Sequence, residues 1–199
     1  MHDANTTIES FLAAAAAKQP TPGGGAVTAL AGALAASMGE MVLQYSVAKK
    51  DLAAHAALNA EVLAELTRAR GVLLELMAED QAVFAELTAA KKAGGETATY
   101  VDACIAVPQT IGITALAILD LANRVAGTSN KYLLSDLAVC GELAMAAIRS
   151  AVHSVRANLN DVPAERKTEL NAECERLIGR GVTAIRSLMA AIDLAKGAA

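Results

Sequence analysis

A run of two prolines and three glycines at residues 20–25 (PTPGGG) can bring a ligand close to the backbone. The prolines hold the entering chain extended, and the glycines leave no side chain where the next helix begins. Helix-forming residues follow at 27–47. The glycines should therefore lie at a helix N-terminus, where free N–H groups and the helix dipole attract an anionic or electron-rich group. A tight turn with close helix packing explains the same composition, and both interpretations stay open.

Asp80 is a carboxylate on a helix face that the apolar pattern turns inward. Met77 and Phe84 lie three and four residues away from it, and this spacing places all three side chains on one face. Because burial of a carboxylate is costly unless it is paired or used, Asp80 is a candidate general acid and base. The alternative is a structural pair between Asp80 and a cation in the core.

Other polar residues occur near the expected helix ends. Asn130, Ser135 and Asp136 cluster where a helix begins, and there Asn130 or Ser135 could serve only as a helix cap. Lys49 ends another helix. It either complements the negative end of the dipole or binds an anionic ligand.

The sequence patterns of metal and nucleotide sites are missing. The three histidines, His2, His55 and His153, form neither Glu-x-x-His nor His-x-x-x-His, so a carboxylate-bridged metal site is not expected. The glycines lack the Lys-Ser/Thr of a phosphate-binding loop, and no predicted strand precedes them. A net charge of −4 gives no electrostatic reason to expect nucleic-acid binding.

Helices must position these residues, because no stretch of the chain alternates convincingly with the period of a strand. The 199 residues are 54% hydrophobic and only 3% aromatic, which predicts a core of alanine and leucine between closely spaced helices. We expect one all-α bundle, a single domain over residues 1–199. About six helices are predicted, near residues 6–18, 27–47, 52–92, 97–125, 131–158 and 163–194.

The sequence predicts a cytoplasmic protein. Cys104, Cys140 and Cys174 are odd in number and widely spaced, as expected for reduced thiols, and the first residues lack the basic start of a secretory signal. We expect no membrane span, because Glu40 interrupts one apolar run, and Pro108 and Asp120 interrupt the other.

Several of these segments, taken in order, resemble the cyclodeaminase/methenyltetrahydrofolate cyclohydrolase family. The matching segments are TPGGGAV at 21–27, EDQAVF at 79–84 for the family's Asp-x-x-x-Phe, Val107-Pro108, Asn130 with Ser135-Asp136 for its Asn-x-x-x-x-Ser-Asp, and Asn158-Leu159. The likeness covers about residues 6–160, and the proline–glycine motif is its most specific part.

The resemblance implies an all-helical homodimer that acts on a tetrahydrofolate derivative and uses neither a metal nor any cofactor beyond the folate. Asp80 falls at the position of the family's catalytic aspartate. By the same resemblance, the residues that would line the folate site are Thr21, Pro22, Gly23, Gly24, Gly25, Lys49, Asn130, Ser135 and Asp136.

Three functions stay open at this point. The first is hydrolysis of 5,10-methenyltetrahydrofolate to 10-formyltetrahydrofolate, with Asp80 as general acid and base. The second is release of ammonia from 5-formiminotetrahydrofolate, and it is less favoured because the family's ammonia-releasing members are often fused to a formiminotransferase domain, for which this chain has no room. The third is a folate-binding or helical assembly protein without the reaction, which the short segment after Lys92 favours.

Overall fold

The computed structural model describes residues 2–197, and every regular element in that range is helical. The α-helices are α1 (Ile8–Ala16), α2 (Gly24–Val47), α3 (Ala56–Ala93), α4 (Ala98–Val125), α5 (Leu134–Ala157) and α6 (Ala164–Gly197). Three short 3-10 helices, η1 (Lys50–His55), η2 (Lys131–Leu133) and η3 (Leu159–Asp161), lie between them. The predicted all-α class with about six helices is confirmed.

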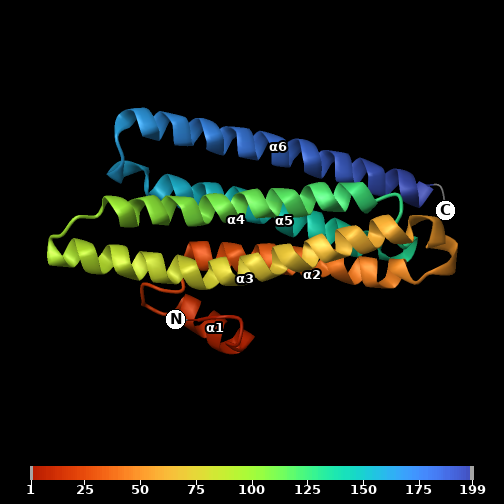
Figure 1. Ribbon diagram of the computed structural model, residues 1–199, viewed down its shortest axis with the longest axis horizontal. Coiled ribbons are helices and arrows are strands. Elements are labelled where there is room, and N and C mark those ends of the chain that lie inside the picture. The colour runs from red at the N-terminus through yellow and green to blue at the C-terminus, as the bar shows by residue number, and fades with distance from the viewer. Residues whose placement is uncertain (1, 198–199) are drawn as a thin grey trace.

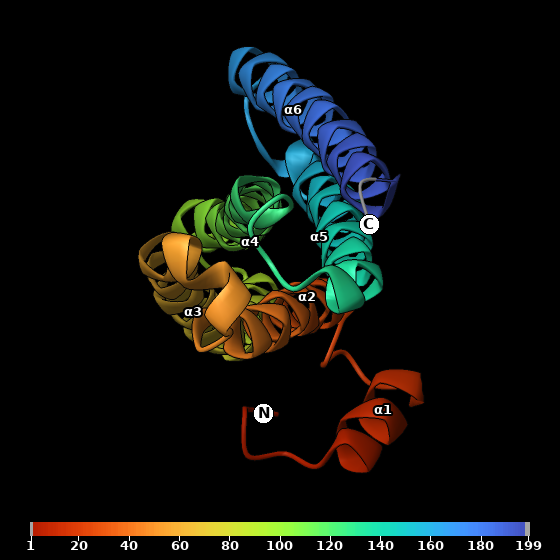
Figure 2. The same ribbon diagram turned by 90° about the vertical axis from the view of Figure 1, so that its right-hand side faces the viewer.

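The long helices form a layered bundle. α2 and α3 lie side by side, α4 and α5 cover them, and α6 lies along the outer side of α4 and α5 (Figures 1 and 2). Leucine, isoleucine and alanine side chains from α2 to α6 fill the main hydrophobic cluster. α1 lies apart from the long helices in both views, and Phe11 is its buried residue.

Small residues of α2 bring it close to its neighbours within the chain. A methyl group on Gly32 would lie 3.1 Å from Leu73 of α3, and one on Gly39 would lie 2.8 Å from Leu66. The predicted close helix contacts are therefore present, because leucine side chains of α3 fill the space that these glycines leave.

Helix ends differ from the sequence-based boundaries by a few residues. The side chain of Thr7 caps α1 by accepting a hydrogen bond from the Ser10 N–H. α3 begins at Ala56, after η1, and ends at Ala93, and the next residue, Gly94, has a left-handed conformation (φ 66°) that suits glycine. α4 continues through Pro108 instead of breaking there.

Two of the core helices are apolar enough to satisfy the length and composition criterion for a membrane span. They are α2 and α4, so the expectation that Glu40 and Pro108 would disqualify these runs was wrong. A single charge or proline still leaves an apolar window of sufficient length. More than half of each window is buried inside the bundle, 56% in α2 and 61% in α4, and core helices pass the same criterion, so the finding is weak evidence for a membrane.

The three cysteines are free and buried, as the sequence predicted. Burial raises the pKa of the Cys140 thiol to about 12, which keeps this side chain protonated and unreactive.

Candidate functional site

The Asp80 carboxylate lies against the first turn of α2. Gly25 is buried beneath it, and a methyl group at that position would overlap the carboxylate atoms. Because Gly25 has no side chain, the carboxylate reaches the backbone of the helix, where the Ala26 N–H favours its charged form. The glycine run and the candidate acid, which are 55 positions apart in the sequence, thus form one site.

Burial sets the protonation of Asp80. The pKa of this carboxyl is raised from its ordinary value of 3.8, chiefly because partial burial disfavours the charged form. The Ala26 N–H opposes this rise in pKa, since it favours the charged carboxylate. The side chain remains only half-buried, so a ligand or water molecule can reach it.

The face of α3 around Asp80 is only partly turned inward. Met77 is buried, as predicted, but Phe84 is 43% exposed, and its predicted inward orientation was wrong. The reason is the position of α2: this helix begins opposite Asp80, so one turn further along α3 no part of it covers Phe84. An exposed aromatic ring therefore lies on the same face as the half-buried carboxylate.

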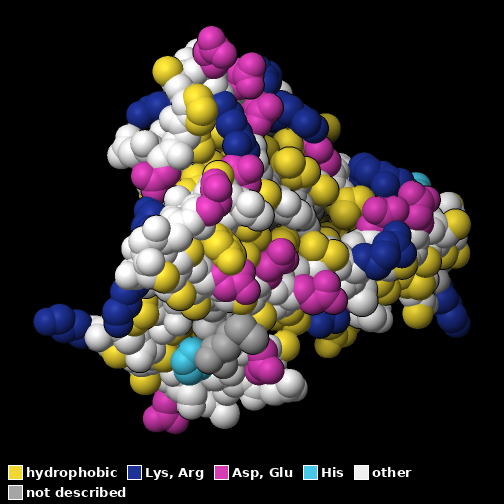
Figure 3. Space-filling view, turned by 60° about the vertical axis from the view of Figure 1, so that its left-hand side comes forward, with side chains coloured by type: hydrophobic (Ala, Val, Ile, Leu, Met, Phe, Trp, Pro, Cys, Tyr) yellow, Lys and Arg dark blue, Asp and Glu magenta, His cyan; other side chains and the backbone are white. Residues whose placement is uncertain are grey.

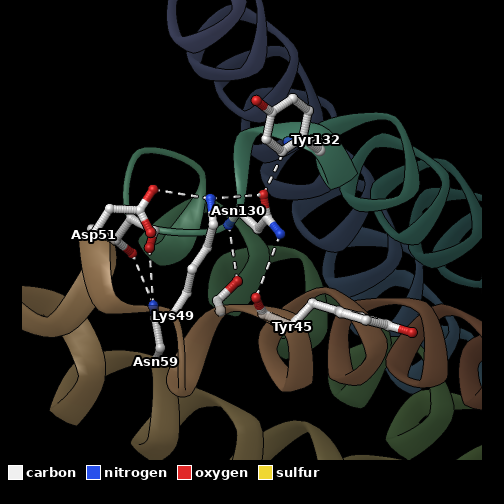
Figure 4. Close-up of polar contacts among 8 residues, drawn as sticks. Tyr45, Lys49, Asp51, Asn59, Asn130 and Tyr132 are labelled. Atoms are coloured by element: carbon white, nitrogen blue, oxygen red, sulfur yellow. Dashed lines mark hydrogen bonds and ion pairs between the residues drawn. The ribbon is translucent and has the colours of Figure 1, made fainter.

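A second group of candidate residues surrounds Lys49 at the opposite end of α2 (Figure 4). The Lys49 ammonium lies 3.0 Å from an Asp51 carboxylate oxygen and 3.5 Å from Asn130 Oδ1. Asn130 is held in turn by its N–H, which donates to Ser46 Oγ at 2.9 Å, and by its side-chain oxygen, which accepts from the Tyr132 N–H at 3.2 Å. Asn130 is thus the cap of η2, the structural role that the sequence left open for it.

The remaining predicted residues lie close to this second group in the chain. Ser135 is exposed and Asp136 half-buried, and both belong to the first turn of α5. Beside Asn130, the buried Ser129 hydroxyl has no hydrogen-bond partner within residues 2–197. The exposed ring of Tyr132 lies 5.4 Å from the Lys49 ammonium.

The candidate residues therefore form two groups at the two ends of α2. The proline–glycine group consists of residues 21–25 with Asp80, and the lysine–amide group consists of Lys49, Asn130, Ser135 and Asp136. Since α2 has 24 residues at 1.5 Å each, about 36 Å separates its ends. One chain does not bring the two groups together around a single small molecule.

One face of the molecule has a surface of mixed character. On the face shown in Figure 3, acidic and basic side chains lie among one another, with hydrophobic side chains exposed between them. A cavity of about 360 Å³ lies elsewhere, between α4, α5 and α6, and is lined in part by Pro108, Val152 and Leu177. None of the candidate residues lines this cavity.

Sequence reasoning missed residues that hold the candidates in place. Ser46 lies one turn before Lys49, and its position as a polar residue on an apolar helix was the available signal. Gln81 is buried and binds the backbone of His2 next to Asp80. No spacing rule in the sequence connects those two positions, because the contact is tertiary.

The fold and the two groups define an all-helical protein with a carboxylate at a glycine-rich helix N-terminus. The profile of the formiminotransferase-cyclodeaminase family matches residues 7–176. The chain belongs to this family, and the resemblance found in its sequence is confirmed.

Relatives of known name include two enzymes. The chain is 32% identical over 165 residues to the methenyltetrahydrofolate cyclohydrolase of Methylorubrum extorquens, covering 77% of this chain and 79% of the relative. It is 26% identical over 183 residues to the formimidoyltransferase-cyclodeaminase of Gallus gallus, covering 86% of this chain but only 34% of that longer protein.

A solved structure shows the same fold. The crystal structure described as formiminotetrahydrofolate cyclodeaminase from Thermotoga maritima matches with a TM-score of 0.89, covering 95% of this chain and 96% of the other. The sequence identity is 23%.

Proposed function

We propose that this protein hydrolyses 5,10-methenyltetrahydrofolate to 10-formyltetrahydrofolate, with Asp80 as the general acid and base. The observation that carries the proposal is the half-buried Asp80 carboxylate, held on the first turn of α2 by Gly25 and Ala26. The similarity to the Methylorubrum extorquens cyclohydrolase, which extends over most of both chains, supports this choice of reaction.

The carboxylate suits each step of this hydrolysis. The methenyl bridge is a cation, so a nearby negative charge stabilises the bound substrate and favours the ionised form of Asp80. Water adds its oxygen to the bridge carbon and gives a proton to Asp80. Asp80 then protonates N5 as the bond from the carbon to N5 breaks, and the hydroxyl proton leaves to solvent as the formyl group forms. One proton is released in total.

The surroundings of Asp80 are suited to a flat heterocycle. Apart from its chain neighbours and its own helix turn, no atom lies within 4 Å of where a Gly24 side chain would be, so a ring can approach the backbone there. The half-exposed Phe84 offers an aromatic face one turn from the carboxylate. Thr21 and Gly23, which directly precede α2, are half-buried, and Pro22 between them is buried.

The lysine–amide group has the chemistry of a second half of a folate site. Asn130 and Asp136 can exchange hydrogen bonds with the pterin, and Lys49 can bind an anionic glutamate tail. Because this group lies about 36 Å from Gly24, we propose that a second subunit supplies it in a homodimer.

An exposed apolar stripe along α2 supports an antiparallel dimer. It repeats in steps of four and three residues, as in a helix–helix seam, through Val27, Ala31, Leu34, Met38, Met41 and Tyr45. Val27, Leu34 and Tyr45 are 44%, 51% and 64% exposed, so no part of this chain covers them well.

The stripe is symmetric about the level of residue 36. An antiparallel copy would set Val27 beside the partner subunit's Tyr45 and Leu34 beside the partner subunit's Met38. The same register brings Gly23 level with the partner subunit's Lys49, so each proline–glycine group would meet a lysine–amide group. Two complete sites would result from one symmetric contact.

Ring closure of 5-formiminotetrahydrofolate with release of ammonia is the second candidate. The observation that favours it is the close structural likeness, at a TM-score of 0.89, to the Thermotoga maritima protein described as a cyclodeaminase. In this reaction Asp80 would protonate the departing ammonia. For either reaction we propose a cytoplasmic protein that uses no cofactor beyond the folate.

The loss of methenyltetrahydrofolate absorbance, measured against the uncatalysed rate, tests the proposal directly. We expect the wild-type protein to accelerate this loss without releasing ammonia from 5-formiminotetrahydrofolate. Ammonia release would instead support the second candidate. Folate binding without either reaction would identify a binding protein that has lost catalysis and would contradict both.

A further inference from the structure

Two neighbouring side chains of α3, those of Asp80 and Gln81, contact the two ends of the N-terminal segment. Gln81 binds the backbone of His2, and the neighbouring Asp80 contacts Gly25. The chain between His2 and Gly25, which includes α1, is therefore a closed loop that starts and ends at one turn of α3 (Figures 1 and 2).

The side-chain amide of Gln81 makes three hydrogen bonds, two of them with the backbone of His2. Its Nε2 donates to the carbonyl oxygens of His2 at 2.6 Å and Met77 at 2.9 Å, and its Oε1 accepts from the His2 N–H at 2.8 Å. The side chain is 2% exposed. The His2 ring also lies edge-on to Phe11 at 6.2 Å, and Phe11 belongs to the main hydrophobic cluster.

The glycines at the far end of this loop have few contacts of their own. A side chain at Gly24 would meet nothing within 4 Å, and one at Gly23 would meet only the Pro20 carbonyl, at 3.7 Å. Pro22 is buried, but Thr21 and Gly23 are half-buried and Gly24 is exposed, so packing holds only part of residues 21–24. Fixing both ends of a loop reduces the conformations open to all of it, so the Gln81 attachment helps to hold these residues in place.

We propose that Gln81 is a positioning residue: by closing the N-terminal loop on α3, it holds residues 21–24 in the geometry that receives the folate beside Asp80. The inference rests on the proposed function for its substrate, but the loop and its attachment are independent of the reaction. The predicted consequence is a loss of substrate affinity when the attachment is removed, with the chemistry at Asp80 largely retained.

Three variants test the attachment from both sides. Gln81→Met removes the amide but keeps the length of the side chain. His2→Pro removes both the His2 ring and the N–H that donates to Gln81 Oε1, whereas His2→Ala removes the ring alone, so the difference between the two variants isolates the N–H. Asn123→Leu is the control for a general loss of stability, because Asn123 Nδ2 likewise donates to two carbonyls, those of Leu119 and Ala184 at 2.9 Å each, far along α4.

We expect Gln81→Met and His2→Pro to raise KM about fivefold, the size expected for one net hydrogen bond, with kcat changed less than about twofold. His2→Ala and Asn123→Leu should keep the wild-type KM. Hydrogen exchange at the Gly23 and Gly24 amides should be faster in Gln81→Met and His2→Pro, which measures loop order without any reaction.

An unchanged KM in Gln81→Met and His2→Pro, or an equal rise in Asn123→Leu, would overturn the positioning role. So would wild-type exchange rates at Gly23 and Gly24 in Gln81→Met. If the wild-type protein turns over neither folate, the proposed function fails, and the exchange rates still decide whether Gln81 orders the loop.

Discussion

At the scale of single residues, the site depends on the contact between Asp80 and Gly25. The carboxylate is partly desolvated and lies against the first turn of α2, whose Ala26 N–H favours its charged form. Gly23, the residue before α2, has no side chain that could cap the helix, so the Asp80 carboxylate can take this role. The same carboxylate is the proposed general acid and base.

Replacement of Asp80 by asparagine separates these two roles. Asparagine still caps a helix, but it cannot take a proton from water, so we expect kcat to fall by about 10²–10⁴-fold. The free energy of unfolding should hold or rise, since a partly buried charge is removed. Steady-state kinetics and thermal melting on one preparation measure both quantities. Normal turnover per folded molecule, with a lower melting temperature, would leave Asp80 only a structural role.

The raised pKa of Asp80 predicts how activity and stability depend on pH. The base form is lost as pH falls through the raised pKa, so the acid limb of kcat/KM should have its midpoint above 3.8. Between 3.8 and the raised pKa the folded state binds more protons than the unfolded state, so this group lowers stability as pH rises. The stability gain of Asp80→Asn should therefore grow over that range and vanish below it, as urea titrations at several pH values can show.

Gly25 and its neighbour Gly24 provide a matched pair of substitutions. Gly25→Ala places a methyl group in the carboxylate and should displace Asp80, lowering kcat by at least about tenfold. Gly24→Ala meets open space and should remain folded, and the bulkier Gly24→Val should raise KM by blocking the ligand. Steady-state kinetics of the three variants distinguish a ligand-binding surface from a turn needed only for packing. Equal effects of Gly25→Ala and Gly24→Ala on kcat would contradict the ligand-binding surface.

At the scale of elements, the sequence predicted the helices well because most boundaries carry local signals, such as the proline–glycine run before α2 and Gly94 after α3. The sequence also identified both Asp80 and Gly25 as candidate residues, although only the family resemblance assigned them to one site. Phe84 was misplaced because helical periodicity gives a face but not where the covering helix begins. The separation of the candidate residues into two groups at the two ends of α2 could have been predicted, since Gly24 and Lys49 flank one helix of known length.

The apolar stripe of α2 leads to a prediction about association. Leu34 lies two residues from its centre and is 51% exposed, so Leu34→Glu would put two like charges close to the dimer axis. We expect a monomer by light scattering at micromolar concentration, with an unchanged helical circular dichroism spectrum. Leu194→Glu, at a position 77% exposed on α6, is the control and should remain dimeric. A wild-type protein that is itself monomeric would contradict the dimer.

At the scale of the whole molecule, shared sites would make two inactive variants complement each other. Asp80→Asn and Lys49→Met alter the two halves of the proposed site, so a mixed dimer has one site with both changes and one with neither. After unfolding and refolding together at equal amounts, about one quarter of the sites should be intact by random assortment. Activity near the sum of the separate variants would show that each site lies within one chain.

The packing of Asp80 on Gly25 also sets a rule for related sequences. Only a hydrogen atom fits between the helix and the acid, so the two positions cannot vary independently. A relative that carries any side chain in place of Gly25 must have moved or lost the carboxylate. In an alignment of the family, the residues at positions 25 and 80 should be compared together. They should separate the members that keep the acid at the helix from those that retain only the scaffold.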